Sequence, residues 1–361
     1  MWKIGSKELK LDYGKKAKWY YGSLLRNTKL IIYNFLEKYG EEIFIENISN
    51  PFCFDCFLYA IGFEEITSGT TTVFSSILKE IINYESGIFI AGGKSLSAFK
   101  VPEELNNLKE IFGFSEEKIE YLKYCSRMTA KVDNCAIQDG FRLYHHLMII
   151  SKNGTWAVIQ QAMNPIIGTA RRYHWYSRKM KNFVEEPHQG IISKQRVNEV
   201  LDMTSMKSSD SRKASLDILK EKTSKIKRIT ETNNQNQMKL TNWIFNEKEI
   251  NFSPKRLPRI INWKLLNKLH ENVPKTYEEL LSIKGVGESI IRLLALSAEI
   301  LYGIHPSYED PAFLEEEFYN CNGNGGKNCK LLETINEVDY NFIKNSMLRR
   351  LERCNRACIP S

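Results

Sequence analysis

The residues best suited to chemistry gather around one apolar stretch in the first half of the chain. Asp133 and Asp139 precede this stretch, His146 lies within it and His174 follows it. A carboxylate can activate water as a base, so we expect this role for Asp133 or Asp139. An imidazole can exchange a proton near neutral pH, and we expect His146 or His174 to act as acid or base. A purely structural network of the same polar groups is the alternative.

A basic and aromatic run follows directly. Arg171 and Arg172 begin it, Tyr173 and Trp175 lie within it, and no acidic residue interrupts it before Lys181. Guanidinium groups bind phosphate, and aromatic rings stack on bases. We therefore expect the two arginines to clamp phosphate and the aromatic side chains, with Tyr144, to stack on a flipped base. A solvated helix face is the alternative for such a charged run.

A candidate polar pocket is expected where these segments meet. A helix should precede the apolar stretch and present Arg127, Lys131 and Asn134 on one face, because they are four and three residues apart. The remaining members of the pocket come from the stretch itself and its flanks. The candidates are Arg127, Lys131, Asn134, Gln138, Tyr144, His145, Gln160, Gln161 and Asn164.

The apolar stretch itself, residues 141–163, predicts a β-hairpin. Asn153-Gly154 favours a two-residue type I′ turn, in which both residues have positive φ. His146 would then face Gln161, and Leu147 would face Gln160. In that register Tyr144, His146 and Gln161 share one sheet face with the apolar side chains of Met148, Ile150, Ala157 and Ile159. Buried polar groups need partners, so that end of the face should hold a network or open into a pocket.

The most specific motif lies at residues 276–302, which resemble a helix-hairpin-helix. Gly285 and Gly287 allow a tight turn, and Val286 between them would help join the two helices. The N–H groups that begin the second helix, near Ser289, can bind phosphate oxygens, with Lys284 adding a cation. Such contacts anchor the nucleic-acid backbone without reading sequence. An ordinary helical hairpin with a glycine-rich turn is the alternative.

Two features of that motif bear on chemistry. Some DNA glycosylases and lyases place a catalytic Asp about twenty residues after the hairpin, and Asp310 follows Gly287 at a loosely similar offset. Other such enzymes use a Lys early in the second helix. Here Glu288, Ser289 and Ile290 occupy those positions. A Schiff-base lyase of that kind is disfavoured.

Composition sets the class of protein. The 361 residues carry a net charge of +8 with 42% hydrophobic residues, which is typical of a globular chain with more than one domain. The segment 205–260 holds 13 Lys or Arg and 6 Asp or Glu, a surplus of +7. We expect no membrane segment, because no apolar run approaches about 18 residues. The first residues lack the pattern of an export signal, so we expect a cytoplasmic protein.

The cysteines and glycines do not indicate a metal or nucleotide site. Cys53 and Cys56 lie in an aromatic stretch without a second pair nearby, so a buried helix is favoured over zinc. Cys321, Cys329, Cys354 and Cys358 lack zinc-finger spacing. Gly92-Gly93-Lys94-Ser95 ends like a phosphate-binding loop but lacks its first glycine, so a short strand at residues 88–91 explains it better. We predict no resident metal.

The predicted fold class is α+β. A mostly helical N-terminal domain, residues 1–190, should carry a small antiparallel sheet with the hairpin. It should contain helices at residues 15–39, ended by Gly40, at 51 onwards, capped by Asn50, and at 70–84. A basic helical or flexible region, residues 191–253, should lead to an all-α domain, residues 254–361, with the helix-hairpin-helix.

Nine short runs of the chain are specific enough to compare with known families: Tyr13–Trp19, Ser68–Thr72, Gly87–Lys94, Ser126–Asn134, Gln138–Gly140, Leu143–His146, Gln160–Asn164, Ala170–Trp175 and Glu186–His188. They resemble one family, domain of unknown function 763, found largely in archaea and some thermophilic bacteria. The chain differs from the family pattern near Asp12 and within residues 315–328, where Gly325-Gly326-Lys327-Asn328 lacks the usual terminal acid. The family has no settled activity, and the resemblance implies that the polar runs and the C-terminal motif form one working unit.

Together these features predict a nucleic-acid backbone-binding protein of DNA repair or processing, with DNA favoured over RNA. As an enzyme it would be a nuclease, with Mg²⁺ as the cofactor to test, or a base-excising glycosylase. The first alternative is a non-catalytic DNA- or RNA-binding module that recruits partners. A scaffolding protein that binds no nucleic acid is the second alternative.

Overall fold

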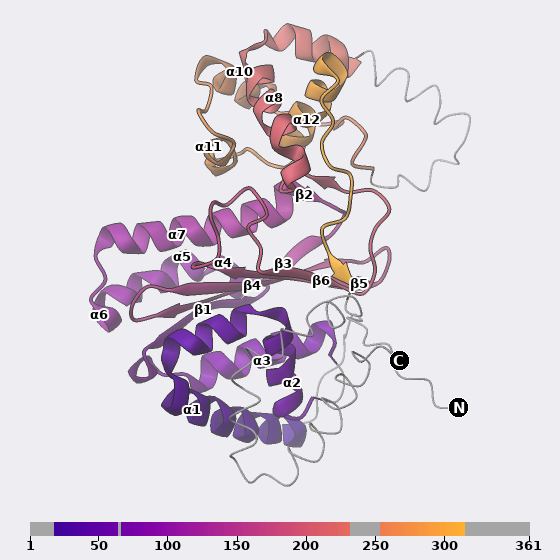
Figure 1. Ribbon diagram of the computed structural model, residues 1–361. Helices are drawn as coiled ribbons and strands as arrows, with labels where there is room; N and C mark the ends of the chain where they lie inside the picture. The colour runs from indigo at the N-terminus through magenta and orange to yellow at the C-terminus, as the bar shows by residue number, and fades with distance from the viewer. Residues whose placement is uncertain (1–17, 64–65, 232–252, 315–361) are drawn as a thin grey trace, which may run out of the picture.

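A computed structural model describes residues 18–63, 66–231 and 253–314 of the chain (Figure 1). Its centre is a six-stranded sheet with the strand order β1-β3-β4-β5-β6-β8. All neighbours in this sheet are antiparallel except β6 and β8, which are parallel. The strands are β1 (Ile88–Lys94), β3 (Arg142–Ser151), β4 (Trp156–Asn164), β5 (Thr169–Tyr176), β6 (Gly190–Ser193) and β8 (Phe313–Leu314).

Three helices cover one side of this sheet, which we call the α1 face. They are α1 (Lys18–Ser49), α2 (Pro51–Ala60) and α3 (Ser68–Ile81). Asn50 caps α2 by accepting hydrogen bonds from the first-turn amides, and Pro51 occupies the first helical position, as the sequence predicts. Gly40 has φ 76° and interrupts α1, although the helix then resumes as far as Ser49. Cys53 and Cys56 are buried in α2, as predicted.

The opposite side, which we call the α7 face, packs against the long helix α7 (Glu116–Lys131) and the short helices before it. Above it, in the orientation of Figure 1, lie a two-stranded sheet and several further helices. One apolar core runs from this face through α7 into α8, α11 and α12. The other labelled elements, in chain order, are η1 (Tyr84–Ser86), α4 (Leu96–Phe99), α5 (Val101–Glu104), η2 (Leu105–Asn107), α6 (Leu108–Phe112), the π-helical turn η3 (Val132–Ala136), β2 (Ile137–Gln138), β7 (Leu201–Asp202), η4 (Met206–Ser208), α8 (Ser209–Lys220), α10 (Trp263–Glu271), α11 (Tyr277–Ser282) and α12 (Glu288–Tyr302).

The predicted hairpin is present, but its predicted register is wrong by one residue. The Ser151 amide donates to the Thr155 carbonyl over 2.8 Å, so three residues rather than two form the loop. Gly154 has φ 90°, whereas Asn153 does not have positive φ. This combination is typical of a type I turn followed by a glycine bulge.

The register decides which side chains share a face. His146 pairs with Gln160, and His145 pairs with Gln161. His146 and Gln160 therefore lie on the α7 face, whereas His145 and Gln161 lie on the α1 face. The single polar end predicted for one face is in fact two polar clusters, one on each face.

The predicted mixture of helices and an antiparallel sheet is confirmed. Within the described ranges no helix combines the length and the apolar character needed to cross a bilayer. The stretch 315–328 and the cysteines from Cys321 onwards lie outside the described residues.

Candidate functional site

Asp133 is the centre of a buried hydrogen-bond network on the α7 face. Its Oδ1 lies 2.6 Å from Nε2 of His188, and its Oδ2 accepts from Nε2 of Gln160 over 2.6 Å and from Nε1 of Trp175 over 3.1 Å. Burial raises the pKa of Asp133, and the charge and hydrogen bond of His188 oppose that rise. The π-helical turn η3 projects Asp133 toward the sheet, where three side chains fix the carboxylate.

His146 extends this network to α7. Its Nδ1 lies 3.0 Å from Oε1 of Gln160, and its Nε2 lies 2.9 Å from Oγ of Ser126. Because the Gln160 amide nitrogen donates to Asp133, its oxygen must accept, which assigns the proton of His146 to Nδ1. Burial lowers the pKa of His146. A continuous hydrogen-bonded chain therefore runs from Ser126 through His146, Gln160 and Asp133 to His188.

Arg171 forms a second network on the same face. Its guanidinium pairs with Asp139 over 2.5 Å and also with Asp310, and all three side chains are almost fully buried. Asp310 also accepts from the Val197 amide over 2.7 Å. Burial, with Asp310 as a second nearby carboxylate, outweighs Arg171 and raises the pKa of Asp139 to about 6. Arg171 thus links the sheet to the segment after α12.

Arg172 points to the α1 face and forms a separate network. Its guanidinium donates to Asp55 of α2 over 2.6 Å and to Nε2 of His174 over 2.7 Å. Nδ1 of His174 lies 3.1 Å from the Ser49 carbonyl oxygen. Burial and then the charge of Arg172 hold the pKa of His174 well below its usual value. Both arginines expected to clamp phosphate are fully buried, on opposite faces of β5.

Three other predicted pocket residues lie near Arg172 on the α1 face. Tyr144, at a register shift in β3, donates to Oε1 of Gln161 over 2.7 Å. Nε2 of His145 lies 3.1 Å from Oγ of Ser75 in α3. Burial lowers the pKa of His145 to about 3, so this histidine is neutral at physiological pH. None of these groups lies in the Asp133 network.

Lys131 and Gln138 reach the turn between α11 and α12 instead. The Lys131 ammonium donates to the carbonyls of Ile283 and Val286, and burial lowers the pKa of Lys131. Gln138 donates to the Glu288 carbonyl over 3.0 Å. These two side chains therefore attach the turn to the end of α7 and to β2.

The other predicted pocket residues are dispersed. Arg127 is exposed on α7. Asn134 accepts from the Leu143 amide over 3.4 Å, and Asn164 accepts from the Ile166 amide over 3.0 Å. Because α7 changes to a π-helical turn after Lys131, Asn134 does not continue the helix face that carries Arg127.

The turn between α11 and α12 exposes its polar side to solvent. Lys284 and Gly285 are exposed, and Val286 is buried. Gly285 has φ 93°, a conformation that favours glycine. Gly287 has an extended backbone, and a Cβ added there would meet no atom of the described structure. Gly287 also caps α12 without a side-chain acceptor, two residues before the half-buried Ser289.

Cationic groups surround the start of α12. Arg142, whose side chain is 57% exposed, pairs with Glu288 in the first turn of the helix. Arg292 lies close enough for its pKa to be affected by both Glu288 and Arg142, although burial is the larger effect and lowers it. With Lys131 and Lys284 the group holds four cations and one acid, a net charge of +3.

The sequence places Ser126 and His188, the two ends of the Asp133 chain, in runs that resemble the family, but no role in the site was predicted for either. His188 lies in an irregular segment after β5, and its approach to Asp133 is a long-range contact that no local pattern encodes. The adjacent Pro187 was the one local signal of a fixed backbone there.

Comparison with known proteins gives one match. The description "Protein of unknown function (DUF763)" matches residues 5–332. No curated protein and no solved structure matches the chain. Since the match covers most of the sequence and agrees with the resemblance carried by its motifs, the chain belongs to the DUF763 family of proteins of unknown function.

Proposed function

We propose that this protein binds the sugar-phosphate backbone of nucleic acid, with DNA as the favoured ligand, through the turn between α11 and α12. One observation carries the proposal. Lys284 and Gly285 are exposed directly before a 15-residue helix whose N-cap is a glycine without a capping side chain. The first amides of such a helix, with its dipole, attract phosphate.

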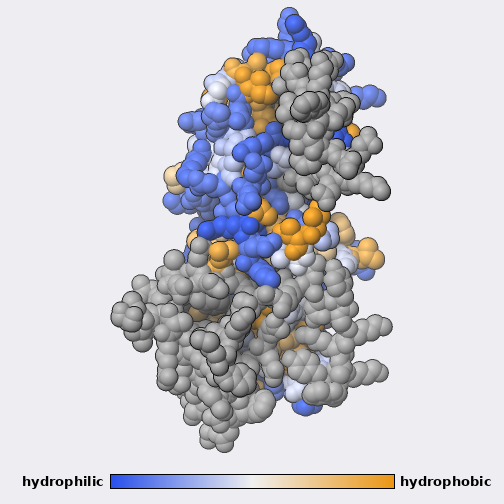
Figure 2. Space-filling model, turned by 90° about the vertical axis from the view of Figure 1, so that its right-hand side faces the viewer, coloured by the Kyte–Doolittle hydropathy of each residue, from blue (hydrophilic) through white to orange (hydrophobic). Residues whose placement is uncertain are grey.

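The surroundings of the turn support this proposal. Glu288 would repel phosphate from the first turn of α12, but its pairing with Arg142 offsets that charge. The ammonium of Lys131 holds two carbonyls behind the turn, which fixes its shape. Figure 2 shows the side of the molecule that lies to the right in Figure 1, where both hydrophilic and hydrophobic side chains reach the surface of the upper, helical part.

The test is the affinity of the full chain for labelled single- and double-stranded DNA of about 20 nucleotides, measured by fluorescence anisotropy at low salt. Lys284→Glu should weaken binding about tenfold and flatten its salt dependence, because a phosphate contact is lost and a repulsive charge is gained. Lys109→Glu, an equal charge change on the exposed surface of α6, is the matched control and should have little effect. Equal losses in the two variants would show that only net charge matters and would overturn the proposal.

A reaction on DNA is a second candidate, favoured by the Asp133–His188 pair. Asp133 can orient the imidazole of His188, while the hydrogen-bonded chain to Ser126 holds Asp133 in place. Within the described part of the chain, Nδ1 of His188 makes no hydrogen bond, which leaves it for a water or a substrate. In this second candidate function, His188 would act as acid or base in cleavage of the backbone or release of a base.

The second candidate is tested on single-stranded, branched and base-damaged DNA with and without Mg²⁺. His188→Gln should lower turnover about 100-fold or more while binding is retained. His174→Gln, a buried histidine on the opposite face, is the control for loss of packing. If the wild-type protein leaves every substrate intact but binds it, the protein is a binding module and this candidate is wrong.

A further inference from the structure

The backbone of edge strand β1 shows which of its groups point away from the sheet. The Gly87 carbonyl accepts from the Lys152 amide over 2.8 Å, and the Ser95 amide donates to the Tyr144 carbonyl over 2.7 Å. Both contacts are with β3 or its loop, so odd-numbered positions turn their backbone groups toward β3. At Ile88, Ile90 and Gly92 the N–H and C=O groups therefore point outward, beyond the sheet edge.

One end of this outer edge is covered by side chains. The Gly92 amide donates to Oε2 of Glu104 over 2.7 Å, and its carbonyl accepts from Nζ of Lys79 over 2.9 Å. Lys79 and Glu104 also pair with each other over 2.8 Å. Ile88 and Ile90 have no such partners among the described residues. The edge is thus closed at Gly92 and open from Ile88 to Ile90.

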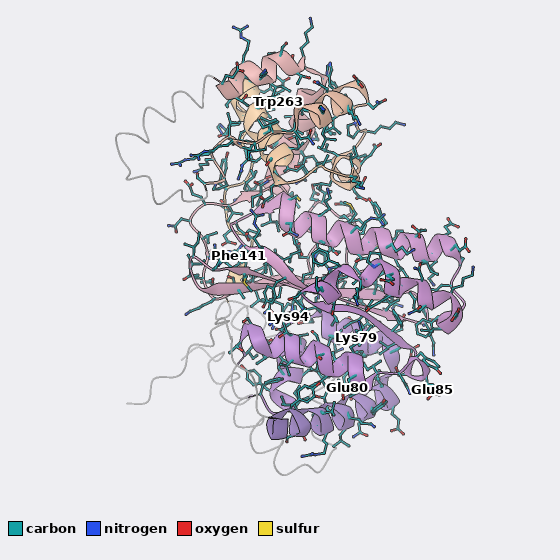
Figure 3. The ribbon with its side chains drawn as sticks, turned by 180° about the vertical axis from the view of Figure 1, so that it is seen from behind. Lys79, Glu80, Glu85, Lys94, Phe141 and Trp263 are labelled. Atoms are coloured by element: carbon teal, nitrogen blue, oxygen red, sulfur yellow. The ribbon has the colours of Figure 1, made fainter. Side chains whose placement is uncertain are left out.

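A pocket of about 300 Å³ lies along this open part of the edge. Ile82 and Asn83, just after α3, line one wall, and Asn107 and Ile111 line the other. Because α3 covers the α1 face and α6 packs on the α7 side, the pocket lies between the two layers. A further strand beside β1 would occupy this place. Figure 3 labels Lys79 and Glu85, which lie on the same side of the lower part of the molecule.

The rim of the pocket is acidic. Glu85 is exposed and accepts from the Asn83 side chain over 3.2 Å, so its carboxylate lies at the edge of the pocket. Glu110 is exposed one helical turn from Asn107 and shares a side of the helix with it. Lys79 and Glu104 neutralise each other. An occupant with basic residues therefore complements the rim.

We propose that β1 takes up an extended, basic segment of a partner protein as an additional strand. The main chain of the segment pairs with the open N–H and C=O groups of Ile88 and Ile90. One apolar side chain enters the pocket between Ile82 and Ile111, and flanking Lys or Arg side chains lie near Glu85. The Lys79–Glu104 pair ends the added strand at Gly92. This site is separate from the turn between α11 and α12 and does not depend on nucleic-acid binding.

The experiment uses the full chain and a labelled peptide of about seven residues, with a central isoleucine, flanking lysines and threonines elsewhere. Its matched partner carries N-methyl groups at alternate residues, which removes the donors that would reach Ile88 and Ile90. We expect the methylated peptide to bind about tenfold more weakly, and Glu85→Lys to weaken binding of the unmethylated peptide severalfold. Glu271→Lys, an equal change at an exposed site on α10, should leave binding unchanged.

Three results would overturn the proposal. One is equal binding of the two peptides, which would exclude strand pairing. Another is no binding of the unmethylated peptide up to about 1 mM. The third is self-association of the wild-type protein in sedimentation that Glu85→Lys abolishes, because the edge would then pair with a second copy of this chain instead.

Discussion

The two faces of the central sheet carry similar polar residues but use them differently. On the α1 face, Arg172 pairs with one carboxylate, Asp55, and one neutral histidine, His174. On the α7 face, Arg171 pairs with two carboxylates, Asp139 and Asp310. The α1-face network joins N-terminal elements to one another, whereas the α7-face network extends to the segment after α12.

This difference between the two faces indicates which side of the sheet carries the candidate functional residues. Every polar group of the α1-face network is enclosed by α1, α2 and α3, which is the arrangement of a structural clamp. The α7 face holds the Asp133 chain, which ends at His188, and the side chains that attach the turn between α11 and α12. Candidate chemistry and candidate binding therefore lie on one side of the sheet, with the α1 face as its support.

The largest expected effect comes from removing each buried guanidinium. Arg171→Met leaves two buried carboxylates without their shared cation and should lower the free energy of unfolding by about 5 kcal/mol. Arg172→Met leaves one buried carboxylate without its cation and should lower the free energy of unfolding by about 3 kcal/mol. Urea denaturation of each variant, followed by circular dichroism, measures the difference.

Arg178→Met is the matched control for this comparison. Arg178 lies just after β5 and pairs with Glu42, but its side chain is 58% exposed, so its loss should cost less than about 1 kcal/mol. If Arg171→Met costs no more than Arg172→Met, the two faces do not differ in charge balance and the comparison fails.

Much of the fold could be predicted because its signals are local. Asn50-Pro51 marks the start of α2, and the apolar run around Asn153-Gly154 marks the hairpin. The predicted register was wrong because an Asn-Gly pair suits both a two-residue turn and the last two positions of a three-residue loop. One residue of difference moves every side chain to the other face.

The site was predicted less well, because its contacts join residues distant in sequence. Asp133 and His146 were chosen from polar density and do share one network, but His188 and Ser126 complete it from other elements. Arg171 and Arg172 lie on opposite faces of the sheet because neighbouring side chains of a strand alternate between its faces. This placement was not predicted from the sequence, because no β-strand was predicted at residues 169–176.

A smaller expected effect is that the stability of the fold depends on pH with opposite sign for a buried group on each of the two faces. Burial lowers the pKa of His145 on the α1 face to about 3, below the value of about 6.5 in an unfolded chain. Its contribution to stability is present above about pH 6.5 and is lost as the pH falls. Burial raises the pKa of Asp139 on the α7 face to about 6, above about 3.9 when unfolded. The contribution of Asp139 to the stability of the fold is present below about pH 4 and is lost as the pH rises through about 6.

The measurement is the free energy of unfolding at about pH 7 and pH 5 for the wild type, His145→Gln and Asp139→Asn. From pH 7 to pH 5 the wild type should lose about 2 kcal/mol relative to His145→Gln and gain about 1 kcal/mol relative to Asp139→Asn. Differences between variants cancel the titration of groups common to all three proteins. The opposite signs follow from burial, which disfavours the charged form of both groups, the cation of His145 and the anion of Asp139. If both differences have the same sign, the direction assigned to one of these two pKa shifts is wrong.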